Sequence, residues 1–164
     1  MKARRILFYI FMVIVIAINV LIIVESAIGG DGSASQSFSF SEAFINWIES
    51  FDPSTVLIPD REAFHAVFRK VVGHFLLFGG SGLFTTLTLM MHDKLYDKFK
   101  WKIILFSAGF GLTIAFISEL IQYFTPDRYG AFTDVLIDFG GYVLFMGLSY
   151  LVTFLIFKKH RKNK

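Results

Sequence analysis

The sequence contains no cysteine, so it carries neither a disulfide framework nor thiol chemistry. Charged residues are also scarce, at 18% of the 164 residues, while 55% are hydrophobic. A soluble domain of this length carries about 25% charged residues. The few basic residues gather at the ends of apolar segments, which is typical of membrane topology and not of nucleic-acid binding. The composition therefore predicts an all-α integral membrane protein, with a single domain over residues 1–164.

Four apolar stretches are long enough to cross a membrane as helices, and we expect them at about 6–28, 63–91, 103–124 and 132–157. The first contains an uncharged run of 19 residues, Ile6 to Val24. A cleaved signal peptide is the alternative for this stretch. Its apolar run exceeds the roughly 7–15 residues of a signal-peptide core, so we expect a retained membrane anchor.

Residues 29–62 form the longest polar segment, which begins with a small and flexible stretch at Gly29 to Ser35. A short amphipathic helix is expected from Ser41, a candidate N-cap residue. Its apolar face repeats at helical spacing through Phe44, Trp47, Ile48 and Phe51. Such a helix fits the membrane interface or packs on the outer surface of the protein, and the sequence leaves both alternatives open.

Small residues indicate where the helices approach closely. They are Gly73, Gly79, Gly80, Ser81 and Gly82 in the second span, and Ser107 with Gly111 in the third. Asn19 in the first span is expected to form a hydrogen bond between packed helices.

Basic residues also predict the orientation, because loops rich in Lys and Arg stay in the cytoplasm. Placing both termini and the 92–102 loop on one side collects 12 of the 16 Lys and Arg residues there. The other side keeps Arg61, Arg69, Lys70 and Arg128. Both termini are therefore expected in the cytoplasm, with the 29–62 loop outside.

Ionisable residues of three helices then converge at one level of the outer leaflet. Acids in apolar helices are costly, so these faces should turn inward and pair across the helices. The predicted ligand-binding pocket consists of Arg69, Lys70, His74, Glu119, Gln122, Arg128, Asp134 and Asp138. The purely structural alternative is that each polar group marks a helix end meeting water, with Asp134 as a cap residue and Lys70 reaching a lipid headgroup.

Two chemical alternatives remain for this pocket. If the protein is an enzyme, Glu119 would act as the general base and His74 as an acid or base. A divalent metal on His74, Glu119 and Asp134 was weighed as well. No close-spaced ligand motif supports it, so neither a metal nor another cofactor is expected.

The stretch S-E-L-I-Q-Y-F-T-P-D-R-Y-G-A-F-T-D-V-L-I-D-F-G-G at 118–141 resembles the signature of VanZ-like membrane proteins, roughly E-x-x-Q-x-x-x-P-x-R-x-x-x-x-x-D-x-x-x-N-x-x-G. The segment F-R-K-V-V-G-H-F-L-L-F-G-G at 68–80 resembles the Arg-Lys and His segment of the same family. Two positions differ from the family pattern. Asp138 stands where Asn is usual and adds a negative charge, and Phe78 stands where Tyr often follows the His.

The resemblance implies a multi-pass protein of the bacterial plasma membrane, associated with resistance to glycopeptide antibiotics of the teicoplanin type. It implies no established reaction. We therefore expect a non-enzymatic binding or accessory role, with a lipid-linked cell-wall precursor or a glycopeptide antibiotic as the partner. The alternative is a membrane-embedded enzyme that modifies a lipid headgroup or a lipid-linked precursor. A transporter is disfavoured, because the inner halves of the helices carry no acid. The oligomeric state is left open.

Overall fold

The computed structural model describes residues 2–51, 58–92 and 101–162, and every regular element in these ranges is helical. The predicted basic loop at 92–102 lies mostly outside the described residues. In chain order the elements are α1 (Lys2–Ala27), α2 (Gly30–Glu49), α3 (Arg61–Phe68), the π-helix η1 (Arg69–Leu76), α4 (Leu77–Met91), α5 (Trp101–Phe124) and α6 (Phe132–Lys162).

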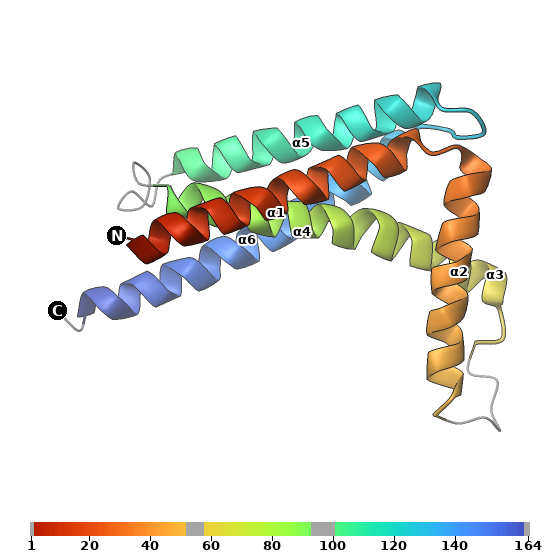
Figure 1. The fold of residues 1–164 in the computed structure, drawn as a ribbon, viewed down its shortest axis with the longest axis horizontal. Coiled ribbons are helices and arrows are strands. Elements are labelled where there is room, and N and C mark those ends of the chain that lie inside the picture. The colour runs from red at the N-terminus through yellow and green to blue at the C-terminus, as the bar shows by residue number, and fades with distance from the viewer. Residues whose placement is uncertain (1, 52–57, 93–100, 163–164) are drawn as a thin grey trace.

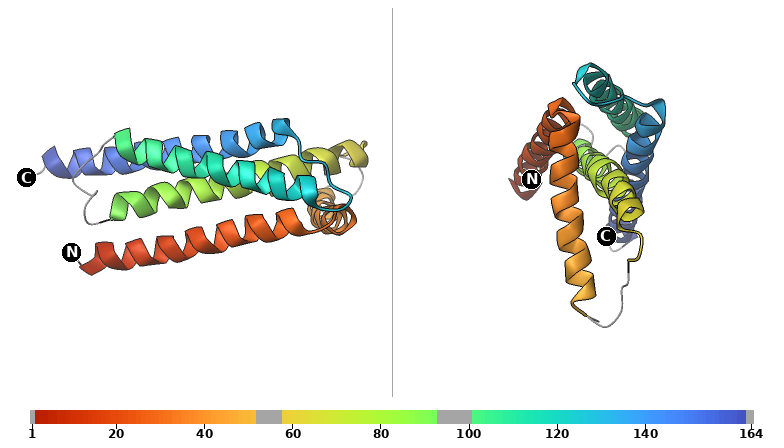
Figure 2. Two further views of the ribbon diagram at one scale, coloured as in Figure 1. Left: turned by 90° about the horizontal axis from the view of Figure 1, so that it is seen from above. Right: turned by 90° about the vertical axis from the view of Figure 1, so that its right-hand side faces the viewer.

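Four long helices form a bundle, and α2 crosses one end of it (Figure 1). Both termini lie at the opposite end, and the two further views show α1, α4, α5 and α6 running along a common direction (Figure 2). Helix α4 contacts α1, α5 and α6. We call the end crossed by α2 the α2 end. There α1 and α5 finish, α6 begins, and α3 with η1 lies beside α2.

The four predicted apolar helices are confirmed as candidate membrane spans, at Lys2–Ala27, Arg61–Met91, Trp101–Phe124 and Phe132–Leu155. Their surfaces expose large apolar side chains, such as Val13 at 62% and Phe106 at 70%. Water would oppose so much apolar exposure, whereas lipid accepts it. Length and surface together define a multi-pass membrane protein.

Small residues let α4, α5 and α6 approach one another around Tyr142, which is completely buried. A Cβ added to Gly111 would stand 2.4 Å from the Tyr142 ring, and one added to Gly82 would stand 2.2 Å from the Tyr142 carbonyl oxygen. The Tyr142 hydroxyl lies 3.1 Å from the Ser107 hydroxyl, which also bonds Thr86. The close approach predicted from Ser107 and Gly111 is therefore present.

The predicted role of Asn19 is also confirmed. Its amide nitrogen donates to the Val15 carbonyl at 2.7 Å, and its amide oxygen accepts from the Ser81 hydroxyl at 3.1 Å. The second bond joins α1 to α4, and Ser81 is completely buried. A polar pair inside the bundle thus links two spans whose other contacts are mainly apolar.

The expected start of the amphipathic helix at Ser41 is wrong. Helix α2 begins at Gly30, and Ser41 is buried in its middle. The stretch expected to be flexible is helical from Gly30 onwards, with Gly29 as the N-cap, and Gly30 anchors the helix start by donating its backbone N–H to the Pro126 carbonyl at 3.2 Å. Serine hydroxyls within α2 donate to backbone carbonyls one turn earlier, as Ser39 does to Ser35. These serines therefore do not compete with the backbone hydrogen bonds of the helix.

Of the two alternatives for the amphipathic helix, packing on the protein itself is observed, on one face of α2. One face packs on α3, where Arg61 donates to Glu42 at 2.9 Å and to Glu49 at 2.7 Å. Phe40 and Trp47 remain exposed, at 72% and 58%. Aromatic side chains exposed at the end of a membrane bundle suit the lipid interface.

The second span runs from Arg61 to Met91 but is π-helical over Arg69–Leu76. π-Helical turns inside α-helices are frequent at functional sites. This one carries Arg69, Lys70 and His74, and it contacts the first turns of α6. Gly141 makes that contact possible, since a Cβ there would stand 2.2 Å from the Phe75 carbonyl oxygen.

Replacing Gly141 by Ala should lower the melting temperature of the detergent-solubilised protein, since α6 must move away from η1. Overpacking of this kind costs about 1–3 kcal/mol. The matched control is Gly140→Ala, one residue earlier in the same helix, where an added Cβ meets nothing within 4 Å. That change should be neutral or stabilising, because alanine favours a helix over glycine by about 1 kcal/mol. Equal melting temperatures for the two variants would contradict the close approach.

Candidate ligand-binding site

The predicted pocket residues gather at the α2 end, and three of them are deeply buried. Glu119 and Gln122 in α5 are each 5% exposed, and Asp138 in α6 is fully buried. A polar cluster this deep among apolar helices requires internal partners, because neither water nor lipid can supply them.

Two pairs connect η1 to the start of α6. The ammonium of Lys70 lies 3.1 Å from an Asp134 oxygen, and Lys70 is half exposed. One turn further in, His74 Nδ1 lies 3.0 Å from Asp138 Oδ1. The pairs are parallel because residues four apart share one helix face in both elements. Asp134 also lies in the first turn of α6, where the helix dipole favours an acid.

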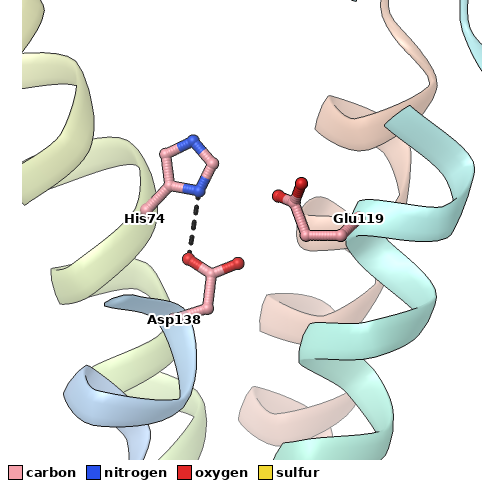
Figure 3. A group of neighbouring side chains, drawn as sticks. All are labelled: His74, Glu119 and Asp138. Atoms are coloured by element: carbon pink, nitrogen blue, oxygen red, sulfur yellow. Dashed lines mark hydrogen bonds and ion pairs between the residues drawn. The ribbon is translucent and has the colours of Figure 1, made fainter. Parts of the chain in front are cut away.

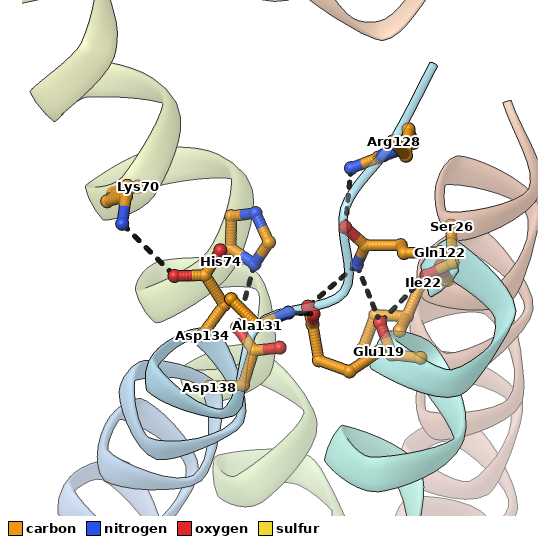
Figure 4. A network of polar contacts seen from close by, with 11 residues as sticks. Ile22, Ser26, Lys70, His74, Glu119, Gln122, Arg128, Ala131, Asp134 and Asp138 are labelled. Atoms are coloured by element: carbon orange, nitrogen blue, oxygen red, sulfur yellow. Dashed lines mark hydrogen bonds and ion pairs between the residues drawn. The ribbon is translucent and has the colours of Figure 1, made fainter. Parts of the chain in front are cut away.

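Glu119 accepts its hydrogen bonds from two neutral donors. Its Oε1 accepts from the Gln122 amide at 2.9 Å, and its Oε2 accepts from the backbone N–H of Ala131 at 2.9 Å. The second bond attaches the linker before α6 to α5. Figure 4 shows this chain of contacts beside the Lys70–Asp134 and His74–Asp138 pairs.

The turn between α5 and α6 directs Arg128 back towards α1. Thr125 donates its hydroxyl to the Ile121 carbonyl at 2.8 Å, and Asp127 adopts a left-handed conformation with φ of 57°. The Arg128 guanidinium then donates to the carbonyls of Glu25 at 2.7 Å and Ile28 at 3.3 Å. It also donates to the Gln122 side-chain oxygen at 2.8 Å (Figure 4).

This geometry differs from the expected arrangement in one respect: Arg128 folds over Gln122 and the end of α1, and it does not pair directly with the acids. Burial lowers the pKa of the Arg128 guanidinium, and the nearby Glu119 carboxylate raises it in part. Arginine remains protonated throughout the physiological range. Arg128 therefore places a fixed positive charge at the rim of the cluster.

A cavity of about 520 Å³ lies beside this network. Four predicted residues line it: Arg69, His74, Gln122 and Arg128. The remaining lining is Leu21, Ile22, Glu25, Ser26, Ser33, Gln36, Ser37, Phe40, Phe44, Phe68, Val72, Gly73, Leu77, Phe78 and Ser118. Most of this wall is apolar, and both of its arginines come from the α2 end.

The eight predicted residues thus divide into three groups. Some line the cavity, Lys70 and Asp134 form a more exposed pair, and Glu119 and Asp138 lie in a buried cluster with His74. His74, Glu119 and Asp138 each bring one donor atom to within 4.8 Å of the others, which is close enough for a shared cation. The metal alternative weighed from the sequence had Asp134 in place of Asp138, but Asp134 pairs with Lys70.

Sequence reasoning missed the contribution of α1 and α2 to the cavity. Ser26 is 3% exposed and bonds the Ser118 hydroxyl at 2.7 Å, and Glu25 belongs to the cavity wall. The available signal was Glu25 itself, an acid that directly follows the uncharged run of the first span. Residues of α2 could not be assigned, because their position depends on how α2 crosses the bundle.

Four apolar spans enclosing a polar cluster at one end define the class: a multi-pass membrane protein with a buried polar site. Comparison with known protein families matches residues 7–155 to VanZ/LLP1, so the chain belongs to the VanZ/LLP1 family. No curated protein and no solved structure gives a match to the chain. The predicted resemblance to VanZ-like proteins is confirmed.

Arg128→Ala should lower the melting temperature of the purified protein, because the variant leaves the carbonyls of Glu25 and Ile28 and the Gln122 side chain without their donor. A hydrogen bond to a charged group contributes about 1.5–3 kcal/mol. Asp127→Asn is the matched control one residue earlier. It removes a charge and keeps a residue type that tolerates the left-handed conformation. If both variants have the same melting temperature as the wild type, Arg128 does not link α1 to α5.

Proposed function

We propose that this protein is a non-enzymatic binding module of the bacterial cell envelope, whose cavity holds a lipid-linked molecule. The cavity itself is the observation that supports this function. Its apolar wall suits an acyl or polyprenyl chain, while Arg69 and Arg128 provide positive charge for an anionic headgroup. Ligand sites of about 300–1,000 Å³ with a few convergent polar groups are typical of small-molecule binding.

A lipid-linked ligand can reach this cavity from the membrane. The cavity lies at the α2 end, between spans and below a helix with exposed aromatic side chains. A molecule anchored by its chain in one leaflet would present its headgroup at the depth of η1. Membership in the VanZ/LLP1 family supports a link to glycopeptide resistance of the teicoplanin type. The proposed partner is therefore a lipid-linked cell-wall precursor or a lipid-bearing glycopeptide.

For this role the α2 end must face the exterior, in the plasma membrane. The charge distribution supports that orientation, because cytoplasmic loops carry the excess of Lys and Arg. Among the basic residues that the structure describes, only Arg61, Arg69, Lys70 and Arg128 belong to the α2 end. Both termini would then lie in the cytoplasm.

The orientation can be tested directly, since the chain has no cysteine. A single Ser35→Cys change on the exposed surface of α2 should react with a membrane-impermeant maleimide on intact cells. Ala3→Cys, at the exposed start of α1, should react only after the membrane is permeabilised. The reverse pattern of labelling would overturn the proposed orientation.

Expression in a susceptible Gram-positive host should raise the inhibitory concentration of teicoplanin by several-fold and change that of vancomycin less. Gly73→Phe should abolish the increase by filling the cavity. Gly73 lines the cavity, and the nearest atom to an added Cβ there is the Arg69 Cγ at 4.0 Å, so the larger side chain has room.

The control for this experiment is Gly109→Phe in α5. An added Cβ at Gly109 meets nothing within 4 Å, and Gly109 does not line the cavity. Membrane amounts of all variants are compared by immunoblot. Unchanged susceptibility with the wild-type protein present in the membrane, or full protection by Gly73→Phe, would count against the proposed function.

A further inference from the structure

The strongest unexplained feature lies beneath the cavity, where three helices direct donor side chains into one space. His74 comes from η1, Glu119 from α5 and Asp138 from α6 (Figure 3). One donor atom of each lies within 4.8 Å of the other two. The three side chains are between 0% and 13% exposed. No two of them are neighbours in sequence, so only the tertiary structure brings them together.

Asp138 lacks a partner on one oxygen. Its Oδ1 meets His74 Nδ1 at 3.0 Å, but its buried Oδ2 has no hydrogen-bond partner. In Figure 3 the Asp138 side chain lies below the His74 ring, and its second oxygen is on the Glu119 side. A buried carboxylate oxygen without a donor destabilises the folded protein, because it has lost its hydrogen bonds to water. A buried polar atom of this kind requires an explanation, and a bound ion or water supplies one.

The charge balance leads to the same conclusion. Among the described side chains no Lys or Arg forms an ion pair with Glu119 or Asp138: Lys70 pairs with Asp134, and Arg128 bonds two carbonyls and an amide oxygen. Two carboxylates therefore share a low-dielectric space with one imidazole. Buried charges are usually paired or coordinate a metal ion.

Surrounding contacts hold the donors in position, as they do around metal ions in proteins. Glu119 is oriented by the Gln122 amide and the Ala131 backbone N–H. His74 and Asp138 are held together where Gly141 lets η1 and α6 approach. The donors therefore belong to rigid helices and not to loops, which favours a preformed site.

We propose that His74, Glu119 and Asp138 bind one divalent transition-metal ion, such as Zn²⁺ or Mn²⁺. One imidazole with two carboxylates suits these ions, whereas Mg²⁺ and Ca²⁺ prefer oxygen ligands alone. Ligands lie about 2.0–2.2 Å from zinc, so the donors must close by on the order of 1 Å in total. Small side-chain rotations supply such a shift. His74 also lines the cavity, so the proposed metal site adjoins it.

The full-length protein, purified in detergent and treated with a chelator, should bind one Zn²⁺ or Mn²⁺ per chain. Asp138→Asn and Glu119→Gln keep the side-chain shape and should each weaken binding at least tenfold, because each removes a charged ligand. Asp127→Asn is the matched control, as it removes an exposed carboxylate at the same end of the bundle that lies outside the cluster. Its affinity should stay within about twofold of the wild type.

A second measurement gives a result on the wild type alone, whether or not the ligand variants fold. Pulsed electron paramagnetic resonance of the Mn²⁺-loaded wild type should detect coupling to an imidazole nitrogen, and His74→Gln should remove it. No binding by the wild type, binding without nitrogen coupling, or equal affinity in Asp138→Asn would each overturn the proposal. The measurement uses the metal alone, without lipid or antibiotic, so its result is independent of the proposed envelope function.

Discussion

Buried polar side chains that must find partners inside an apolar bundle are the constraint on which this structure depends. Lipid cannot satisfy Glu119, Gln122 or Asp138, so the helices that carry them must stay in register. The His74–Asp138 bond joins η1 to α6, and the Glu119–Ala131 bond joins α5 to the start of α6. A shift of any of these helices by one turn would leave charged groups unpaired.

Small residues allow this polar network to form at the α2 end. Close approach at Gly82 and Gly111 packs three spans around Tyr142, and Gly141 brings η1 against α6. The packing that holds the spans together therefore also sets the positions of the site residues. Loosening one helix pair would therefore also separate the donors of the buried cluster.

The polar site has two parts with different chemistry. Arg69 and Arg128 face a mainly apolar cavity that suits the headgroup and chain of an amphipathic molecule. Below it, His74, Glu119 and Asp138 form a compact acidic cluster that suits a cation. His74 belongs to both parts, so a ligand in the cavity lies next to whatever the cluster binds. A lipid-linked partner and a metal ion are thus separate proposals on adjoining surfaces.

Hydropathy and small-residue spacing were enough to predict the four spans, the packing role of Asn19 and the gathering of ionisable groups at one end. These features depend on the amino-acid composition and on the spacing of residues along each helix, and both can be read from the sequence. Helix rotation and the path of α2 decided the rest. In the structure α2 begins already at Gly30, and Arg128 bonds carbonyls at the end of α1. Asp138 lies beside Glu119, a position that the sequence spacing allowed equally for Asp134. These features depend on which helix faces contact each other in the bundle, and local sequence patterns do not determine those contacts.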